Sequence, residues 1–348
     1  MGAYWTASEA GEFATISAIH HLLPVPPESV VTGIGDDTAV LVPPGAPPGT
    51  PHRLLLTADT VVAGVHADLD LTSLADLGWK AVAAAVSDVA AMGGDALWAL
   101  VTVAGPPGTD LSELYGGIAA AAEECECAVV GGDLVNGPTL CVTVAVTGHT
   151  DGDPVRRSGA RPGDAIWVTG PLGAAAAGLR LLRAGARPAR PARSARPTGP
   201  TGPGPAAPAS AEAAAVRAHA RPIARLAEGR AARRAGATAM IDISDGLTAD
   251  LDHLAEASGV GLRLEAVPVH PAATMAEALE GGEDYELAFC APAHAAPALT
   301  GSVPDAFAGL RAPIRIGTCT AEPGERTIGG QPFTPSGWQH AWRWEAGR

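Results

Sequence analysis

The feature that most constrains the fold is an alternation of strand-like and helix-like segments in the first 150 residues. Apolar runs typical of strands lie at 38–42, 53–60, 96–105, 128–133 and 140–149. Two alanine-rich segments, 74–93 and 111–125, are typical of helices. Some strands flank a helix and others follow one another directly, so the pattern predicts an α/β (α+β) fold with a mixed sheet.

The length of 348 residues predicts two domains, at about 100–200 residues per domain. A turn-rich stretch at 150–164 marks the boundary, which gives an N-terminal domain at 1–150 and a C-terminal domain at 151–348. A Pro/Ala/Arg/Gly segment at about 184–210 has low complexity and predicts an insertion without regular structure in the second domain.

Composition narrows the possible functions. The formal net charge of −14 argues against non-specific binding of nucleic acid, which needs a basic surface. It leaves phosphate substrates open, because bound divalent cations can invert the local charge. Lys80 is the only lysine and lies in LGWKAV, so the chain contains no G-x-x-x-x-G-K-[ST] phosphate-binding loop.

The lack of a recognisable targeting signal and the pattern of cysteines predict a cytoplasmic protein without a membrane partner. We find no basic segment followed by an apolar run at the N-terminus, and no uninterrupted apolar run of about 18 residues. The five cysteines form no C-x-x-C pair, which favours a reducing compartment and disfavours a zinc site.

Carboxylates recur at the ends of apolar strands and within apolar helices. MIDISDGLTADLDHL, at 240–254, contains four aspartates among core-forming residues. Asp88 has only apolar neighbours one helical turn away, namely Ala84, Ala85, Ala91 and Met92. A buried carboxylate without a partner is costly, and Mg²⁺ is typically held by carboxylates together with substrate phosphates. The constellation therefore predicts a site for phosphoryl transfer with several Mg²⁺ ions.

Several polar and aromatic residues that could belong to such a site also have a purely structural interpretation. Asp37, next to Asp36, could belong to a solvated turn, and Asp245 could cap the helix that follows it. Arg157 could be a solvated linker charge. Trp338 is more often a packing residue at such a position, and His66 taken alone is an ordinary loop residue.

Seven motifs in order carry a resemblance to a known family. They are GIGDDTAV, LTADT with VVAGVH, K-A-x-A-x-x-x-SDVAAMG, VVGGD, RSGARPGD-x-I-x-VTG-x-LG, IDISDGL and GGEDYEL. Together they resemble the thiamine-monophosphate kinases of the aminoimidazole-ribonucleotide-synthetase-like superfamily. The resemblance runs from about Gly11 to Trp338, apart from the low-complexity segment.

The resemblance implies a fold and an activity. The fold has two domains, and the N-terminal mixed sheet pairs with its counterpart across a homodimer. Such enzymes transfer the γ-phosphoryl group of ATP to thiamine monophosphate and form thiamine diphosphate, with several Mg²⁺ ions as cofactors.

The resemblance also implies roles for individual residues. The implied metal ligands are Asp37, Thr57, Asp59, Asp88, Asp133, Asp242 and Asp245. The implied contacts to ATP are Gly132, Asp133, Arg157 and Ser244. The implied contacts to thiamine monophosphate are His66, Glu283 and Trp338. No general base is implied, because the acceptor oxygen is already anionic.

Two positions depart from the family pattern, and other functions stay open. Ala58 stands where a hydroxyl residue is usual, and Asn136 stands where a basic residue is expected. Other members of the superfamily are alternatives, including selenophosphate, purine-pathway and hydrogenase-maturation enzymes. A selenophosphate synthetase usually has a reactive Cys or selenocysteine near its N-terminus, whereas the first cysteine here is Cys125. A non-catalytic nucleotide-binding scaffold is the alternative from a different class.

Overall fold

The computed structural model describes residues 12–187, 210–293, 303–338 and 340. Most of the predicted insertion at 184–210 lies outside the described residues. In the first part of the chain the elements are α1 (Glu12–Leu22), β1 (Val30–Thr32), β2 (Ala39–Leu41), β3 (Arg53–Val62), α2 (Leu74–Ala91), β4 (Asp95–Gly105), α3 (Leu111–Glu124), β5 (Ala128–Asn136) and β6 (Cys141–Thr150).

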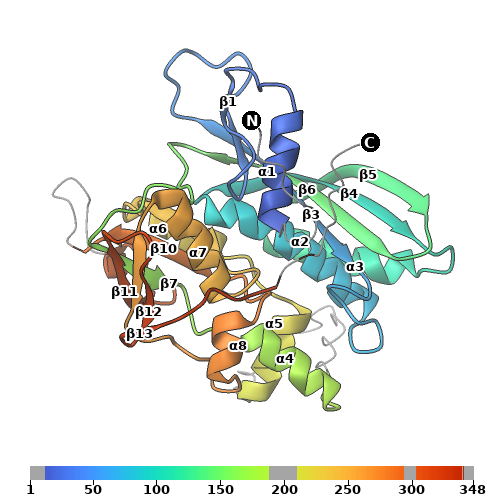
Figure 1. The fold of residues 1–348 in the computed structure, drawn as a ribbon. Helices are drawn as coiled ribbons and strands as arrows, with labels where there is room; N and C mark the ends of the chain where they lie inside the picture. The colour runs from blue at the N-terminus through green and yellow to red at the C-terminus, as the bar shows by residue number, and fades with distance from the viewer. Residues whose placement is uncertain (1–11, 188–209, 294–302, 339, 341–348) are drawn as a thin grey trace, which may run out of the picture.

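The six strands of this part form one mixed sheet in the order β1-β2-β3-β6-β4-β5. All neighbours are antiparallel except β4 and β5, which are parallel and are joined through α3. Helices α2 and α3 cover one face of the sheet (Figure 1). The five strands and two helices predicted here are confirmed within a few residues, and the predicted mixed sheet is confirmed.

The second part of the chain forms a seven-stranded sheet in the order β13-β12-β9-β11-β7-β10-β8. Its elements are β7 (Asp164–Val168), α4 (Ala174–Arg183), α5 (Ala211–Ala220), α6 (Leu226–Arg234), β8 (Ala239–Asp242), α7 (Leu247–Ser258), β9 (Gly261–Leu264), α8 (Met275–Glu280), β10 (Leu287–Pro292), α9 (Val303–Ala306), β11 (Ile314–Thr320), β12 (Arg326–Ile328) and β13 (Gln331–Pro332).

Helices cover both faces of this second sheet. Along β8 the side chains alternate: Ile241 packs on the α7 side, and Met240 packs on the opposite side with α6. The hydrophobic core that contains Met240 also includes Ala90 and Ala91, at the end of α2. Helix α2 therefore lies between the two sheets and packs against both (Figure 1).

The sequence predicts one helix at 222–236, and its start is wrong. Helix α6 begins only at Leu226, and a separate helix, α5, ends at Ala220, before Pro222. The residue before a proline is disfavoured in the helical conformation, and Arg221 is accordingly extended, at φ −139°. Short elements without a clear periodic pattern, α1, β1, α8, α9, β12 and β13, were not predicted.

The turn-rich stretch predicted as a boundary connects β6 to β7, and the division at residue 150 stays a proposal. In the part of the chain that the structure describes, no helix is both long and apolar enough to cross a membrane.

Candidate active site

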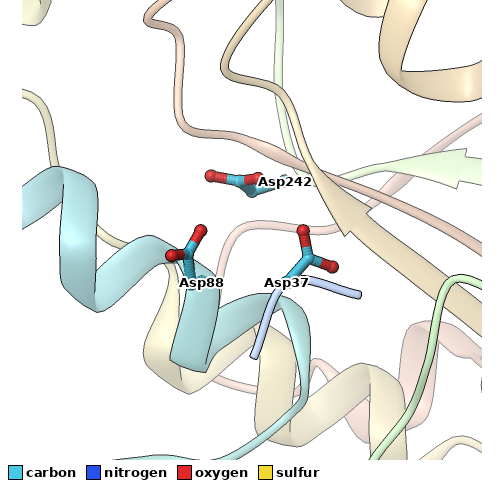
Figure 2. Close-up of side chains that lie close together, drawn as sticks. All are labelled: Asp37, Asp88 and Asp242. Carbon is cyan, nitrogen blue, oxygen red and sulfur yellow. The ribbon is translucent and has the colours of Figure 1, made fainter. Parts of the chain in front are cut away.

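Three aspartates from distant segments meet between the two sheets (Figure 2). One carboxylate oxygen each of Asp37, Asp88 and Asp242 lies within 4.8 Å of the others. Asp37 and Asp242 are buried and Asp88 is partly buried. The structure thus gathers three of the seven predicted metal ligands in one place.

Local structure explains why each aspartate points into this site. Asp37 follows a turn in which Gly35 has φ 120°, a conformation that favours glycine, and it precedes β2. Asp88 lies in the last turn of α2, where the helix passes between the sheets. Asp242 is the last residue of β8, at the end of a fully buried strand. Ligands commonly bind at such strand ends in α/β folds.

Hydrogen bonds orient the three carboxylates. The hydroxyl of Thr57, on β3, donates to Asp88 over 2.5 Å, and the hydroxyl of Ser87 donates to Asp242 over 2.6 Å. The guanidinium of Arg157 lies 2.7 Å from Asp37 Oδ1. Thr57 and Arg157, two residues with predicted roles, therefore contact the aspartates directly.

Crowding of carboxylates away from water raises their pKa values. Burial, followed by the charges of Asp242, Asp37 and Asp59, raises the pKa of Asp88 well above its ordinary value. Burial and the nearby Asp37 raise the pKa of Asp242 to about 7. Repulsion of this kind is relieved by a bound cation.

The donor set fits a hard divalent cation. All three groups offer carboxylate oxygens, the ligands that Mg²⁺ prefers. Asp37 Oδ2 is buried, and no described residue forms a hydrogen bond with it. Buried polar atoms are normally paired, so this orphaned oxygen is available to a metal ion.

A second group of polar residues surrounds the predicted substrate contacts. The Nε2 atoms of His66 and His340 lie 3.3 Å apart, and the ring of Trp338 lies 6.0 Å from that of His340, edge to face. Asp59 connects this group electrostatically to the three aspartates. The charges of His66 and Glu283 act on the Asp59 carboxylate, and the charge of Asp59 in turn acts on Asp88. Burial is the main cause of the raised pKa of Asp59.

Glu283 joins the same group through its side chain. Its Oε2 lies 2.8 Å from Lys80 Nζ and 3.4 Å from His219 Nδ1. Lys80, His219 and His340 were not predicted as site residues. Lys80 is 1% exposed, and this burial emerges only from the fold.

The segment that contains Ser244 and Asp245 holds the two groups together. The backbone carbonyl of Ser244 accepts from the Glu283 N–H over 2.7 Å, and that of Asp245 accepts from the Trp338 N–H over 3.0 Å. The interpretation of Asp245 as a helix cap is wrong for α7. Gly246 is the N-cap residue, and Asp250 Oδ2 accepts from the N–H groups of Asp245 and Gly246.

Gly132 and Asp133 are not brought to the aspartates within one chain. They lie on β5, the edge strand of the first sheet, and Asp133 is exposed. Gly132 is aligned with Asp59 through Val101 and Val144, three strands away, or about 14 Å at the usual strand spacing. Their predicted contacts to metal and ATP stay predictions.

The site described above belongs to a chain with clear relatives. Family models described as the N-terminal and C-terminal domains of AIR synthase related protein match residues 35–150 and 161–329. The thiamine-monophosphate kinase of Salmonella typhimurium is 35% identical over 295 residues, 81% of this chain and 83% of the relative. That of Mycobacterium tuberculosis strain H37Rv is 34% identical, over 96% of this chain and 92% of the relative.

The chain belongs to the thiamine-monophosphate kinase family. A solved structure described as AaThiL complexed with AMPPCP and TMP is 31% identical, with a TM-score of 0.76 over 97% of this chain and all of that chain. The HypE-HypF complex, at 16% identity and a TM-score of 0.62, shows a shared fold alone. The predicted family and the two-domain fold are confirmed.

His219 makes the stability of the folded protein depend on pH. Burial and the neighbouring charge of Lys80 lower the pKa of His219 from 6.5 to about 3. Between those pH values the unfolded chain binds a proton that the folded protein does not, so the free energy of unfolding falls as pH drops. We expect His219→Gln to lose less stability than wild type between pH 6.5 and pH 4 in urea titrations. His52→Gln, at an exposed histidine, is the control and should follow wild type; equal pH slopes for His219→Gln and wild type would contradict the prediction.

Proposed function

We infer that the chain is an ATP-dependent phosphotransferase that converts thiamine monophosphate into thiamine diphosphate. Membership of the thiamine-monophosphate kinase family supports this reaction. The single structural observation that carries it is the meeting of Asp37, Asp88 and Asp242 between the two domains. ATP is the second substrate.

We propose that these aspartates hold Mg²⁺ ions against the phosphates of ATP. When bound, the ions would neutralise the charge of two polyanions that must approach each other. The support is the all-carboxylate donor set and the orphaned oxygen of Asp37. Asp59 and Thr57 border the cluster and are proposed as further ligands, and Asp245 and Asp133 stay proposals on sequence alone.

The chain's own residues supply alignment rather than proton transfer. The acceptor phosphate is already anionic, so catalysis needs positioning and charge complementarity and no general base. Thr57 and Ser87 fix the orientation of Asp88 and Asp242. Arg157, with its planar guanidinium, is proposed to bind a phosphate of ATP. Ser244 and Gly132 are proposed as further contacts to ATP on the sequence resemblance alone.

We propose that His66, Glu283 and Trp338 bind the thiamine part of the acceptor. Trp338 is 52% exposed, so its ring is available to stack on a flat cationic heterocycle. The carboxylate of Glu283 would accept a hydrogen bond from the amino group of the aminopyrimidine ring.

The direct test is to incubate the purified protein with ATP, Mg²⁺ and thiamine monophosphate and to separate the thiamine species by chromatography. We expect thiamine diphosphate only when ATP and Mg²⁺ are both present. Binding of ATP without any product would contradict this acceptor and point to another enzyme of the superfamily.

We also propose a homodimer that forms through the edge of the first sheet. Among the residues that the structure describes, no strand pairs with the outer side of β5, which lies at the edge of the sheet (Figure 1). All residues of β5 are exposed in the single chain. Val130 and Leu134 on this strand are 60% and 56% exposed. An exposed, apolar edge strand pairs readily with another chain, and pairing would place Gly132 and Asp133 near a second subunit.

The double substitution Val130→Lys and Leu134→Lys should convert the dimer into a monomer. Charges on an edge strand oppose strand pairing, because pairing would remove them from water. Sedimentation velocity measures the effect, with Met275→Lys as the control, since Met275 is 51% exposed on a helix of the other domain. A dimer of unchanged affinity in the double variant would place the interface elsewhere.

A further inference from the structure

Lys80 is a buried charge to which the proposed reaction assigns no role. It is only 1% exposed, although lysine is rarely buried without a partner. We propose that Lys80 is a positioning residue that orients the Glu283 carboxylate and so sets the affinity for the thiamine part of the substrate. The inference rests on the proposed function and adds a residue to its substrate site.

The contacts of Lys80 connect two of the three proposed substrate contacts. Its ammonium group donates to Glu283 Oε2 over 2.8 Å and to the backbone carbonyl of His66 over 3.2 Å. One buried cation therefore holds a side chain of the C-terminal domain beside a loop of the N-terminal domain. Residues 80 and 283 are 203 positions apart, so the domain packing creates this pair.

The backbone of Glu283 is fixed independently of Lys80. Glu283 has φ 66° and Tyr285 has φ 49°, conformations that are uncommon outside glycine. The Glu283 N–H donates to the carbonyl of Ser244, and a Cβ at Gly282 would lie 2.4 Å from the same oxygen. The backbone thus sets where the side chain begins, and the contacts at its far end set where the carboxylate points.

Both contacts at that far end use the same oxygen. Lys80 Nζ and His219 Nδ1 lie 2.8 Å and 3.4 Å from Glu283 Oε2. Within the described part of the chain, both side-chain contacts fall on Oε2, so Oε1 is left to accept a hydrogen bond from a donor on the ligand. An oriented carboxylate of this kind suits an amino-substituted heterocycle, because a fixed acceptor binds a donor at lower entropic cost than a mobile one.

Helix α2 relates this carboxylate to the phosphoryl-transfer site. Lys80 and Ser87 are seven residues apart, so they lie on the same face of the helix two turns from each other. Ser87 donates to Asp242, and Lys80 donates to Glu283. The same rigid helix therefore orients one carboxylate of the proposed metal site and the carboxylate proposed to bind the heterocycle.

The test is a double-mutant cycle with Lys80→Met and Glu283→Gln, in which kcat and the KM for each substrate are measured. Lys80→Met keeps an unbranched side chain, shorter by the terminal nitrogen atom, and removes the charge. We expect the KM for thiamine monophosphate to rise about 10-fold or more, as for loss of a charge-assisted hydrogen bond, with the KM for ATP unchanged. In the Glu283→Gln background, Lys80→Met should have little further effect, because the group it orients is already altered.

Arg221→Met separates a positioning role from a structural one. The Arg221 guanidinium lies 2.5 Å from Asp76 and forms another ion pair between α2 and the C-terminal domain, with a carboxylate other than that of Glu283. We expect this variant to lower the melting temperature and leave the KM for thiamine monophosphate unchanged. If Lys80→Met behaves in the same way, or if the two effects in the cycle simply add, the positioning role is wrong.

A binding measurement distinguishes failure of the positioning role from failure of the proposed reaction. Equilibrium dialysis gives the Kd for thiamine monophosphate without turnover. If wild type binds this ligand without phosphorylating it, the proposed reaction fails, and a weaker Kd in Lys80→Met still supports the positioning role. If wild type turns over and the Kd and KM of Lys80→Met are unchanged, the inference alone fails. Absence of binding to wild type overturns both. If Lys80→Met does not fold, the double variant, in which both charges of the pair are absent, is compared with Glu283→Gln, and a large difference in KM overturns the inference.

Discussion

Asp88→Asn should lower the rate of thiamine diphosphate formation by about 10³-fold or more while the protein stays folded. The substitution removes one of three carboxylates that meet between the domains. Loss of metal-based charge stabilisation amounts to several kcal/mol, and each 1.36 kcal/mol is tenfold in rate. The fold should tolerate the change, because an asparagine oxygen can still accept the hydrogen bond from Thr57.

The stability of the same variant gives a second readout. Burial and neighbouring carboxylates raise the pKa of Asp88, so its ionised form opposes folding when no cation is bound. Without Mg²⁺, Asp88→Asn should therefore melt at the same temperature as wild type or higher. With Mg²⁺ and ATP, wild type should gain stability and the variant should gain less.

Glu256→Gln is the matched control for Asp88→Asn. Glu256 is exposed on α7, outside the cluster, so the same loss of a carboxylate should leave both rate and melting temperature unchanged. Near wild-type activity in Asp88→Asn would exclude the helix carboxylate as a metal ligand.

Gly117→Ala should destabilise the N-terminal sheet and its helices by about 3 kcal/mol, because the added methyl group overpacks a tight contact. A Cβ at Gly117, on α3, would lie 1.8 Å from the backbone oxygen of Ala75, on α2. A backbone atom cannot move aside as a side chain can, so the two helices must separate. Thermal unfolding should show a melting temperature lower by on the order of 10 °C.

Gly116→Ala is the control in the same turn of the same helix. Gly116 is exposed, and a Cβ there would meet nothing within 4 Å. Alanine is a better helix former than glycine, so this variant should be more stable by about 0.5–1 kcal/mol. Equal melting temperatures for the two variants would show that α2 and α3 do not pack as closely as described.

The family and the longest helices and strands could be predicted from the amino-acid sequence. The runs that became β3 and β4 and the alanine-rich α2 have strong periodic patterns, which local side-chain spacing sets. The motifs around Asp37, Asp88 and Asp242 carried the resemblance to the family because each lies within a few consecutive residues. The start of the helix predicted at 222–236 was wrong, because the spacing of apolar residues does not mark where α6 begins, at Leu226.

Which of these residues lie in contact could not be predicted from local sequence patterns. Asp88 and Asp242 are neighbours because α2 packs against both sheets, and no local pattern encodes that packing. The same packing buries Lys80 against Glu283 and leaves Asp133 on an open edge strand. Periodicity reports which face of an element is apolar, whereas contacts between residues 150 or 200 positions apart depend on how whole elements pack together.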